Sequence, residues 1–227
     1  MNRMGRHRYD AAMVRRRLDI ELLVLGTIVL CVTAALARRG VYAWEATAFR
    51  SLNELPDDIR PVIWAFNQYG VFITIPVLSV VALLSGRRRL AIALAVSGIG
   101  VYLLAKVMKL YVERGRPGDL LEDVVPREAF APDSLGYPSG HAAVAAALTV
   151  IVAAYLSRRW AIVAICLAII VPLCRTYIGA HLPLDLIGGA ALGVTAAALV
   201  NLVMGVPVRA TVMSGASAGT DPAADPA

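Results

Sequence analysis

The sequence predicts an all-α membrane protein, built as a bundle of six transmembrane helices. Of its 227 residues, 59% are hydrophobic, and the mean hydropathy of +0.69 is far above that of a soluble domain. Apolar runs close to the roughly 20 residues that cross a bilayer recur through the chain. The six expected spans are residues 19–37, 62–85, 90–111, 139–157, 160–174 and 182–208.

Each run is bounded by polar chain. The first continues into Arg38 and Arg39 without a clean small-residue cleavage site, so we expect a retained helix and not a signal peptide. Arginines at 87–89 separate the second run from the third, and arginines at 158–159 separate the fourth from the fifth. Several runs are shorter than a full span, so we expect their polar ends to snorkel or to line a protein-filled cavity.

Tight arginine clusters mark one side of the expected bundle. They lie at residues 15–17, 87–89 and 158–159, all beside span ends on the same side of a six-span topology. The positive-inside rule therefore predicts an inner (plasma) membrane protein with cytoplasmic N- and C-termini. The opposite span ends are expected to be extracytoplasmic.

The remaining chain divides into two tails and one long loop. We expect an Arg-rich cytoplasmic tail over residues 1–17, a six-span domain over 18–208, and a disordered cytoplasmic tail over 209–227, which is rich in Gly, Ala, Asp and Pro. The outer loop 112–138 is longer than a connection between packed helices requires, which favours a functional segment.

The charge distribution argues against nucleic-acid binding, and the cysteine positions argue against a disulfide framework. The net charge of +6 does not indicate nucleic-acid binding, because the basic clusters flank spans and have no interleaved aromatic stacking platform. The expected partner is the lipid bilayer with its anionic headgroups. Cys31, Cys166 and Cys174 lie in apolar runs, so we expect no disulfide framework. The sequence does not indicate an oligomeric state.

Three polar motifs stand where apolar runs meet the outer surface. In the first, Lys109 is followed by Arg116 and Pro117. The two cations can converge on an oxyanion, the arginine as a planar fork and the lysine as a mobile point charge. The plainer interpretation is a pair of snorkelling side chains at the membrane interface.

The second motif is Pro138-Ser139-Gly140-His141, directly before an apolar run. Proline and Ser-Gly at a helix start direct free backbone N–H groups and the positive end of the helix dipole outward, which favours anion binding. The alternative is a simple helix cap with an incidental histidine.

The third motif joins Arg175, His181 and Asp185. His181 and Asp185 are four residues apart, and Pro183 favours a helix start, so the two side chains are expected on one helical face. A carboxylate there can accept the proton of one ring nitrogen and leave the other as a nucleophile or base. The alternative is a structural His–Asp pair.

Together these blocks resemble the type 2 phosphatidic acid phosphatase superfamily of membrane lipid phosphatases. Its signature is Lys, six residues, Arg-Pro; then Pro-Ser-Gly-His; then Ser-Arg, five residues, His, three residues, Asp. This chain matches it with Lys109, Arg116-Pro117, Pro138 to His141, Arg175, His181 and Asp185. One departure is Cys174 in place of the serine, and a thiol is a weaker hydrogen-bond partner.

The resemblance implies a metal-independent phosphohydrolase that needs no cofactor. His181 is implied to be the nucleophile that forms a phosphohistidine, Asp185 to orient it, and His141 to act as general acid and then base. The implied phosphate-binding residues are Lys109, Arg116, Ser139, Gly140 and Arg175.

A site at the membrane–water boundary suits an amphiphile whose tail stays in lipid, so we expect a lipid phosphate substrate. A polyprenyl diphosphate such as undecaprenyl diphosphate is favoured, and phosphatidic acid and phosphatidylglycerol phosphate are alternatives. A rival function is a lipid-phosphate transporter or flippase that binds without hydrolysis. The charges cluster at one face and form no continuous pathway, which disfavours transport.

Overall fold

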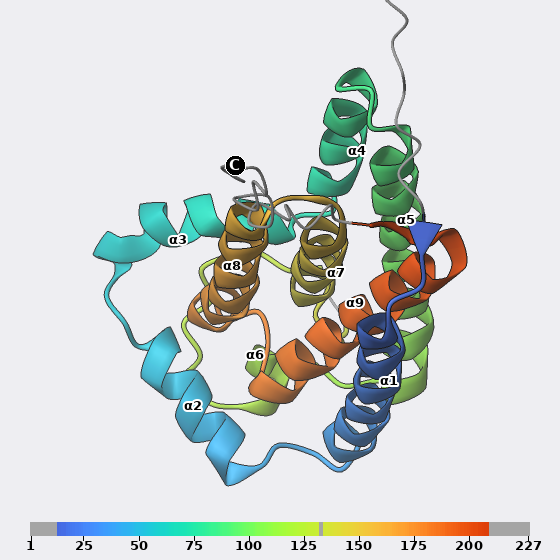
Figure 1. Cartoon of the computed structure of the whole chain (residues 1–227). Helices are drawn as coiled ribbons and strands as arrows, with labels where there is room; N and C mark the ends of the chain where they lie inside the picture. Colours follow the sequence, from blue (N-terminus) through green and yellow to red (C-terminus); the bar gives the residue numbers. More distant parts are fainter. Residues whose placement is uncertain (1–12, 132–133, 209–227) are drawn as a thin grey trace, which may run out of the picture.

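A computed structural model describes residues 13–131 and 134–208 and is mostly helical (Figure 1). The expected tails at 1–12 and 209–227 lie outside these residues. The helices are α1 (Arg17–Ala37), α2 (Ala43–Asn53), α3 (Arg60–Asn67), α4 (Thr74–Leu84), α5 (Arg88–Val112), α6 (Pro117–Leu120), α7 (Gly140–Tyr155), α8 (Arg158–Tyr177) and α9 (Pro183–Met204), with 3-10 turns at Asp57–Ile59 and Gln68–Gly70. Two short strands, β1 (Met13–Val14) and β2 (Val206–Pro207), complete it.

Four of the described helices, α1, α5, α8 and α9, are long and apolar enough to cross a membrane. A bent pair that includes α3 and α4 would make a fifth crossing, and α7, with 16 residues, is shorter than a full span. The structure therefore has fewer full-length spans than the six that the sequence predicts. Large apolar side chains exposed along α1, α4, α5 and α8 fit a surface in contact with lipid.

The second expected span, residues 62–85, is wrong as a single helix. Its two halves, the segment Asp57–Gly70 that contains α3 and the helix α4, differ in direction by 62° across residues 71–73. A Cβ at Gly70 would lie 2.9 Å from the carbonyl oxygen of His141, so the turn runs directly against the first turn of α7. Asn67, which is buried at the break, is a polar residue that a lipid-facing span would not favour.

Helix α9 lies in the centre of the bundle and packs against α1, α5 and α7 (Figure 1). Its close approach to α7 depends on two glycines. A Cβ at Gly189 would lie 2.3 Å from the carbonyl oxygen of Ser139, and one at Gly193 would lie 2.1 Å from that of Ala143. Small residues at such a crossing let two backbones come together. The starts of α7 and α9 are thereby brought side by side.

The other end of α9 is tied to the start of α1. Strand β1 pairs antiparallel with β2, and the fully buried carboxylate of Asp19 accepts hydrogen bonds from Arg16 and from Asn201. Residues 13–17, which the sequence assigns to a tail, thus form an ordered part of the fold. The pairing joins the first and last described segments, residues 13–14 and 206–207, and local sequence patterns carry no signal for such contacts.

Candidate active site

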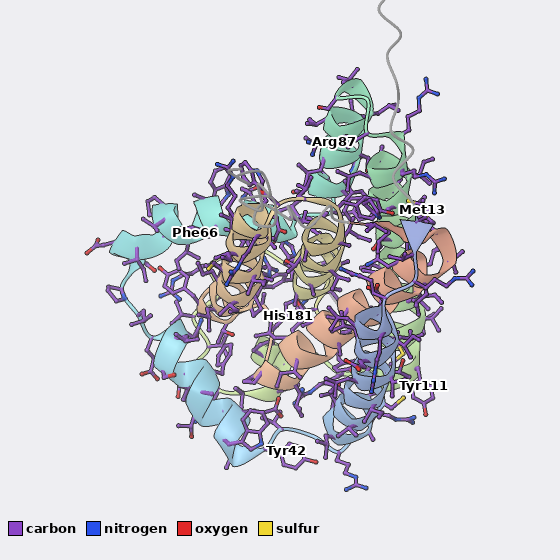
Figure 2. All side chains as sticks on the ribbon, viewed as in Figure 1. Met13, Tyr42, Phe66, Arg87, Tyr111 and His181 are labelled. Atoms are coloured by element: carbon purple, nitrogen blue, oxygen red, sulfur yellow. The ribbon has the colours of Figure 1, made fainter. Side chains whose placement is uncertain are left out.

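The structure brings all eight expected site residues to one end of the bundle. Lys109 lies in the last turn of α5, Arg116 precedes α6, Ser139, Gly140 and His141 start α7, Arg175 lies in the last turn of α8, and His181 and Asp185 flank the start of α9. In the view of Figure 2, His181 lies near the centre, between the surrounding helices, whereas Tyr42 and Tyr111 lie at the periphery.

His181 and Asp185 are almost inaccessible to solvent, with exposed fractions of 3% and 0%. Nδ1 of His181 lies 3.7 Å from Oδ2 of Asp185, which is longer than a hydrogen bond. Nδ1 is buried and has no other hydrogen-bond partner. Of the two ring nitrogens, Nδ1 is the one that lies nearest to the Asp185 carboxylate.

Burial holds His181 in its neutral form. It lowers the pKa of His181 well below the ordinary value of 6.5, and the positive charges of Arg175, Arg116 and Lys109 lower the pKa further. A neutral imidazole keeps an electron pair on one ring nitrogen, as a nucleophile requires.

Both oxygens of Asp185 are held by other groups. Oδ2 accepts a hydrogen bond from the backbone N–H of Leu182 at 2.9 Å, and Oδ1 accepts one from Nη1 of Arg114 at 3.0 Å. Arg114 in turn donates to Glu45 in α2. Arg114 and Glu45 were not among the expected site residues, and they lie 69 residues apart in the chain. Arg114 occupies a variable position of the first motif, and Glu45 belongs to no motif.

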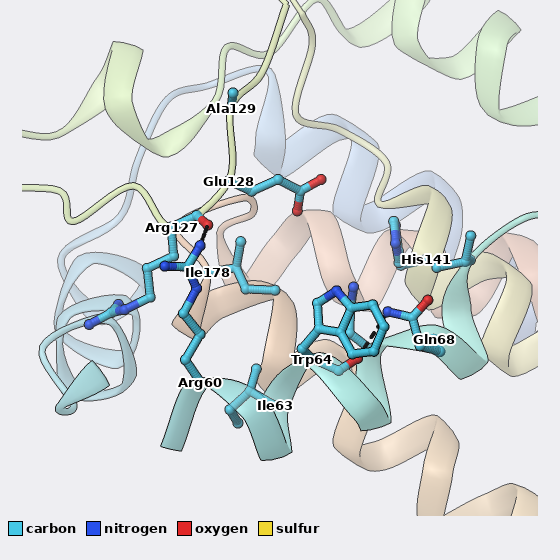
Figure 3. Close-up of a pocket in the computed structure, with 11 residues that line it drawn as sticks. Arg60, Ile63, Trp64, Gln68, Arg127, Glu128, Ala129, His141 and Ile178 are labelled. Carbon is cyan, nitrogen blue, oxygen red and sulfur yellow. Dashed lines mark hydrogen bonds between the residues drawn. The ribbon is translucent and has the colours of Figure 1, made fainter. Parts of the chain in front are cut away.

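His141 lies between two cavities. The α3 cavity, of about 560 Å³, is lined by His141, by Trp64 and Gln68 near the bend, and by Glu128 of the long loop (Figure 3). The α5 cavity, of about 320 Å³, also reaches His141. Its other lining residues are mostly apolar: Gly70, Phe72, Val101, Tyr102, Ala105, Lys106, Lys109, Gly140 and Val144.

Each of the three expected phosphate-binding cations has an internal partner. Lys109 donates to the carbonyl oxygen of Leu135. Arg116 donates to Oγ of Ser134 at 2.6 Å and to the carbonyl oxygen of Ala180 at 3.0 Å. These are neutral partners, so both positive charges remain unbalanced by them.

Arg175 is the exception, because its partner is charged. Its Nη1 lies 2.6 Å from Oε2 of Glu128, while its buried Nε has no hydrogen-bond partner. The guanidinium is 3% exposed and the Glu128 side chain 45% exposed. Glu128 was not expected in the site. It is one of several acidic residues in the long loop, and nothing in the local sequence distinguishes it from the others.

Ser139 and Gly140 shape the start of α7. The hydroxyl of Ser139 accepts a hydrogen bond from the N–H of Ala142 at 3.5 Å, as an N-cap does, and its own N–H donates to the carbonyl oxygen of Asp185 at 2.9 Å. A Cβ at Gly140 would meet nothing within 4 Å, so the backbone there is open toward the α5 cavity.

Cys174 is fully buried and free, one residue before Arg175. Across residues 13–131 and 134–208, no three side chains of His, Cys, Asp or Glu are grouped as metal ligands. The charged groups around the two histidines are chiefly cations, an arrangement that suits an anionic ligand.

The chain is similar to known proteins over more than half of its length. The family model of the PAP2 superfamily matches residues 89–208. An undecaprenyl-diphosphatase of Sulfolobus acidocaldarius is 31% identical over 131 residues, which cover 56% of this chain and 62% of that protein. The chain thus matches less than two thirds of that relative's length.

Two solved structures share the fold. Aquifex aeolicus LpxE superposes with a TM-score of 0.64 at 21% identity, over 70% of this chain and 95% of that one. A PAP2-type phosphatidylglycerolphosphate phosphatase from Bacillus subtilis superposes with a TM-score of 0.58 at 22% identity, over 81% and 94% of the two chains.

Proposed function

Because this chain belongs to the PAP2 superfamily, we propose that it is an integral membrane phosphatase that hydrolyses a lipid phosphate without a metal ion. The observation that carries the proposal is the neutral, buried His181 beside Asp185 and within the field of three cations. A nucleophile, a partner for its developing charge and an anion site are thus combined at one end of a membrane bundle.

In the first step, Nε2 of His181 attacks phosphorus and the bond from phosphorus to the leaving oxygen breaks. His141 donates a proton to that oxygen, so the lipid product leaves neutralised at that atom. The ring of His181 becomes positive as the N–P bond forms. The Asp185 carboxylate, 3.7 Å from Nδ1, stabilises that charge.

In the second step, water attacks the phosphohistidine. His141, now neutral, accepts a proton from the water while the new P–O bond forms. The N–P bond breaks and its electron pair returns to His181, which regenerates the neutral nucleophile and releases phosphate. His141 is protonated again and ready for the next cycle.

The cations and the α7 start hold the phosphoryl oxygens. Lys109, Arg116 and Arg175, together with Ser139 and the N–H of Gly140, are proposed to stabilise the charge of the transition state. The unpaired Nε of Arg175 supports this role, because a buried donor without a partner is costly unless a ligand satisfies it.

The α5 cavity supports a lipid substrate. It is mostly apolar, lies between α5 and the start of α7, and reaches Lys109 and His141. A hydrocarbon tail in this cavity would place the attached phosphate beside both residues. Among lipid phosphates we favour a polyprenyl diphosphate, since the curated relative is an undecaprenyl-diphosphatase, with phosphatidic acid and phosphatidylglycerol phosphate as alternatives.

The proposed location is the inner (plasma) membrane. The arginine clusters at the start of α1, at the α4–α5 turn and at the start of α8 favour cytoplasmic placement of these ends by the positive-inside rule. Lys109, Arg175 and the α9 start lie at the opposite ends of their helices, so the reaction is proposed to take place on the extracytoplasmic side.

Phosphate release by the purified protein tests the proposal. Farnesyl diphosphate, undecaprenyl diphosphate, dioctanoyl phosphatidic acid and phosphatidylglycerol phosphate are offered in detergent, with and without EDTA, to wild type and to His181→Ala. We expect release from wild type that EDTA does not change and that His181→Ala abolishes.

Release that survives in His181→Ala, or that stops in EDTA, contradicts the mechanism. Binding of these lipids by wild type with no release at all would instead favour a transporter. The substrate with the highest kcat/KM identifies the lipid class.

A further inference from the structure

A buried ion network extends from Asp185 to α2. Nη1 of Arg114 donates to Oδ1 of Asp185 at 3.0 Å and to Oε1 of Glu45 at 3.2 Å, while Nη2 donates to Oε2 of Glu45 at 2.7 Å. Arg114 is 4% exposed, and the two acidic residues are fully buried. Two carboxylates thus share one guanidinium inside the protein.

The network also fixes the backbone around Asp185. Oε1 of Glu45 accepts a hydrogen bond from the N–H of Leu184 at 3.0 Å, in the first turn of α9. The carbonyl oxygen of Arg114 accepts one from the N–H of Gly136 at 2.7 Å, and Nη2 of Arg114 donates to the carbonyl oxygen of Gly40 at 3.1 Å. Helix α2, the segment after α5 and the start of α9 are therefore joined at this point.

The charges of the network match the proposed chemistry. Two carboxylates and one guanidinium leave one net negative charge beside His181. That charge is opposite to the one that the ring acquires when Nε2 bonds to phosphorus. Without Arg114, two buried carboxylates would lie together with no hydrogen-bonded cation, and one of them would bind a proton.

We propose that Arg114, held by Glu45, is a positioning residue for the reaction: it keeps the Asp185 carboxylate ionised and directed at Nδ1 of His181. The inference rests on the proposed phosphohistidine mechanism and adds Glu45, which belongs to no motif, and Arg114, which occupies a variable position of the first motif. Glu45 and Arg114 act through Asp185, and neither needs to touch the substrate.

An arginine suits this position for a geometric reason. Nη1 serves both carboxylates and Nη2 serves a carboxylate and a carbonyl, so the planar fork sets the angle between Glu45 and Asp185. A lysine would supply the charge without the fixed fork.

Other charged and titratable groups also face Asp185. His181 lies beside it, and the charges of Lys109 and Arg116 and the phenol of Tyr137 act on it from neighbouring segments. In the part of the chain that the structure describes, Arg114 is the cation hydrogen-bonded to Asp185. Lys109 and Arg116 are engaged by phosphate in the proposed complex, so they do not substitute for it.

The test compares wild type with Arg114→Gln, Arg114→Lys and the double variant Arg114→Gln/Glu45→Gln. Phosphate release from farnesyl diphosphate and dioctanoyl phosphatidic acid gives kcat, KM and the pH profile of kcat/KM. For Arg114→Gln we expect kcat to fall on the order of 10²-fold with KM nearly unchanged. The acid limb, which reports protonation of the His181–Asp185 pair, should move upward by about one pH unit or more, because loss of the Arg114 charge leaves two buried carboxylates that favour a proton on this pair.

The double variant should recover part of the loss and return the acid limb toward wild type, since it also removes the second buried carboxylate. Arg114→Lys keeps the charge, so its acid limb should stay near that of wild type while kcat falls. If Arg114→Gln does not fold, kcat and the acid limb are compared among wild type, Arg114→Lys and the double variant.

Arg16→Gln is the matched control. Arg16 also binds a fully buried carboxylate, that of Asp19, but at the opposite end of α9. The Arg16→Gln variant should have a lower melting temperature and the same pH profile of kcat/KM as wild type. An Arg114→Gln protein that behaves in the same way, or that keeps wild-type kcat, overturns the inference while the proposed function stands. A wild type that releases no phosphate overturns both.

Discussion

Glu128 holds Oε2 2.6 Å from Nη1 of Arg175, so a carboxylate contacts the most buried of the three phosphate-binding candidates. The neighbouring residue, Arg127, is fixed by hydrogen bonds to the carbonyl oxygens of Asn53, Leu55 and Tyr177. The backbone before Glu128 is therefore anchored. The Glu128 side chain lines the α3 cavity, into which it can turn away from Arg175. A phosphate bound by Arg175, as proposed, would compete with this carboxylate.

Replacing Glu128 by glutamine should strengthen phosphate binding. The change removes the competing charge and keeps the side-chain shape, so the inhibition constant of inorganic phosphate should fall about 3- to 10-fold, the range expected for a partly exposed ion pair. Competitive inhibition assays measure it. Glu122→Gln, an exposed acid of the same loop, is the control and should leave the constant unchanged. Weaker inhibition in Glu128→Gln would show that Glu128 supports the site.

Asp185→Asn should impair the chemical step more than substrate binding. The amide keeps the size of the side chain but loses the charge opposite the His181 ring, and the analogous change in the serine-protease triad, a known case, lowers kcat about 10⁴-fold. We expect a kcat loss on the order of 10³- to 10⁴-fold with KM within a few-fold of wild type. An Asp185→Asn enzyme with full kcat would remove Asp185 from the mechanism.

The pH profile of kcat should be bell-shaped, with the acid limb below pH 6.5. The pKa of His181 is lowered by burial and by the three cations, so the enzyme keeps its nucleophile neutral until the pH falls through that lowered value. The alkaline limb should report loss of the proton that His141 holds beside the bound phosphate. A profile that is flat from about pH 5 to 9 would contradict the paired roles of the histidines.

The same shift has a consequence for stability. Because folded His181 resists a proton that the unfolded chain binds below pH 6.5, the unfolded state carries more protons there. The neutral His181 therefore makes its full contribution to the free energy of unfolding above pH 6.5. This contribution is lost as the pH falls below that value. Thermal unfolding of wild type and His181→Gln between pH 5 and 8 measures it, and the variant should lose less stability on acidification.

Gly189→Ala should damage both stability and activity. Its Cβ would lie 2.3 Å from the carbonyl oxygen of Ser139, so α7 must shift away from α9 at the point where it presents His141. Overpacking of this kind costs about 1–3 kcal/mol in unfolding free energy. Gly100→Ala in α5 is the matched control, because a Cβ there meets nothing within 4 Å and favours the helix. Equal melting temperatures for the two variants would contradict the packing argument.

Much of the fold followed from local patterns. The apolar runs predicted α1, α5, α8 and most of α9 because a span needs an uninterrupted stretch of one chemical kind. The prediction was wrong for residues 62–85, where a turn at Gly70 packs against His141. A composition average over this stretch is apolar whether or not it bends, so hydropathy carries no signal for the break.

The candidate site could be predicted only where its residues lie in short motifs. Lys109, His141, His181 and Asp185 stand at the ends of apolar runs, and their spacing indicated a shared site, while their proposed roles came from the family resemblance. The helix start at Ser139 was also predicted and is an N-cap in the structure. Glu45 and Glu128 belong to no such motif, so the sequence alone did not predict them.

The sequence by itself determined that this is a membrane protein with two histidines and an aspartate at the borders of apolar helices, because hydrophobicity and motif spacing act over a few turns of chain. Only the tertiary structure decided which groups surround them. Glu45 reaches Leu184 across 139 residues, and Glu128 reaches Arg175 across 47. The first contact exists because α2 packs on the start of α9, and the second because the long loop folds over the end of α8. Such packing depends on the shape of the whole bundle.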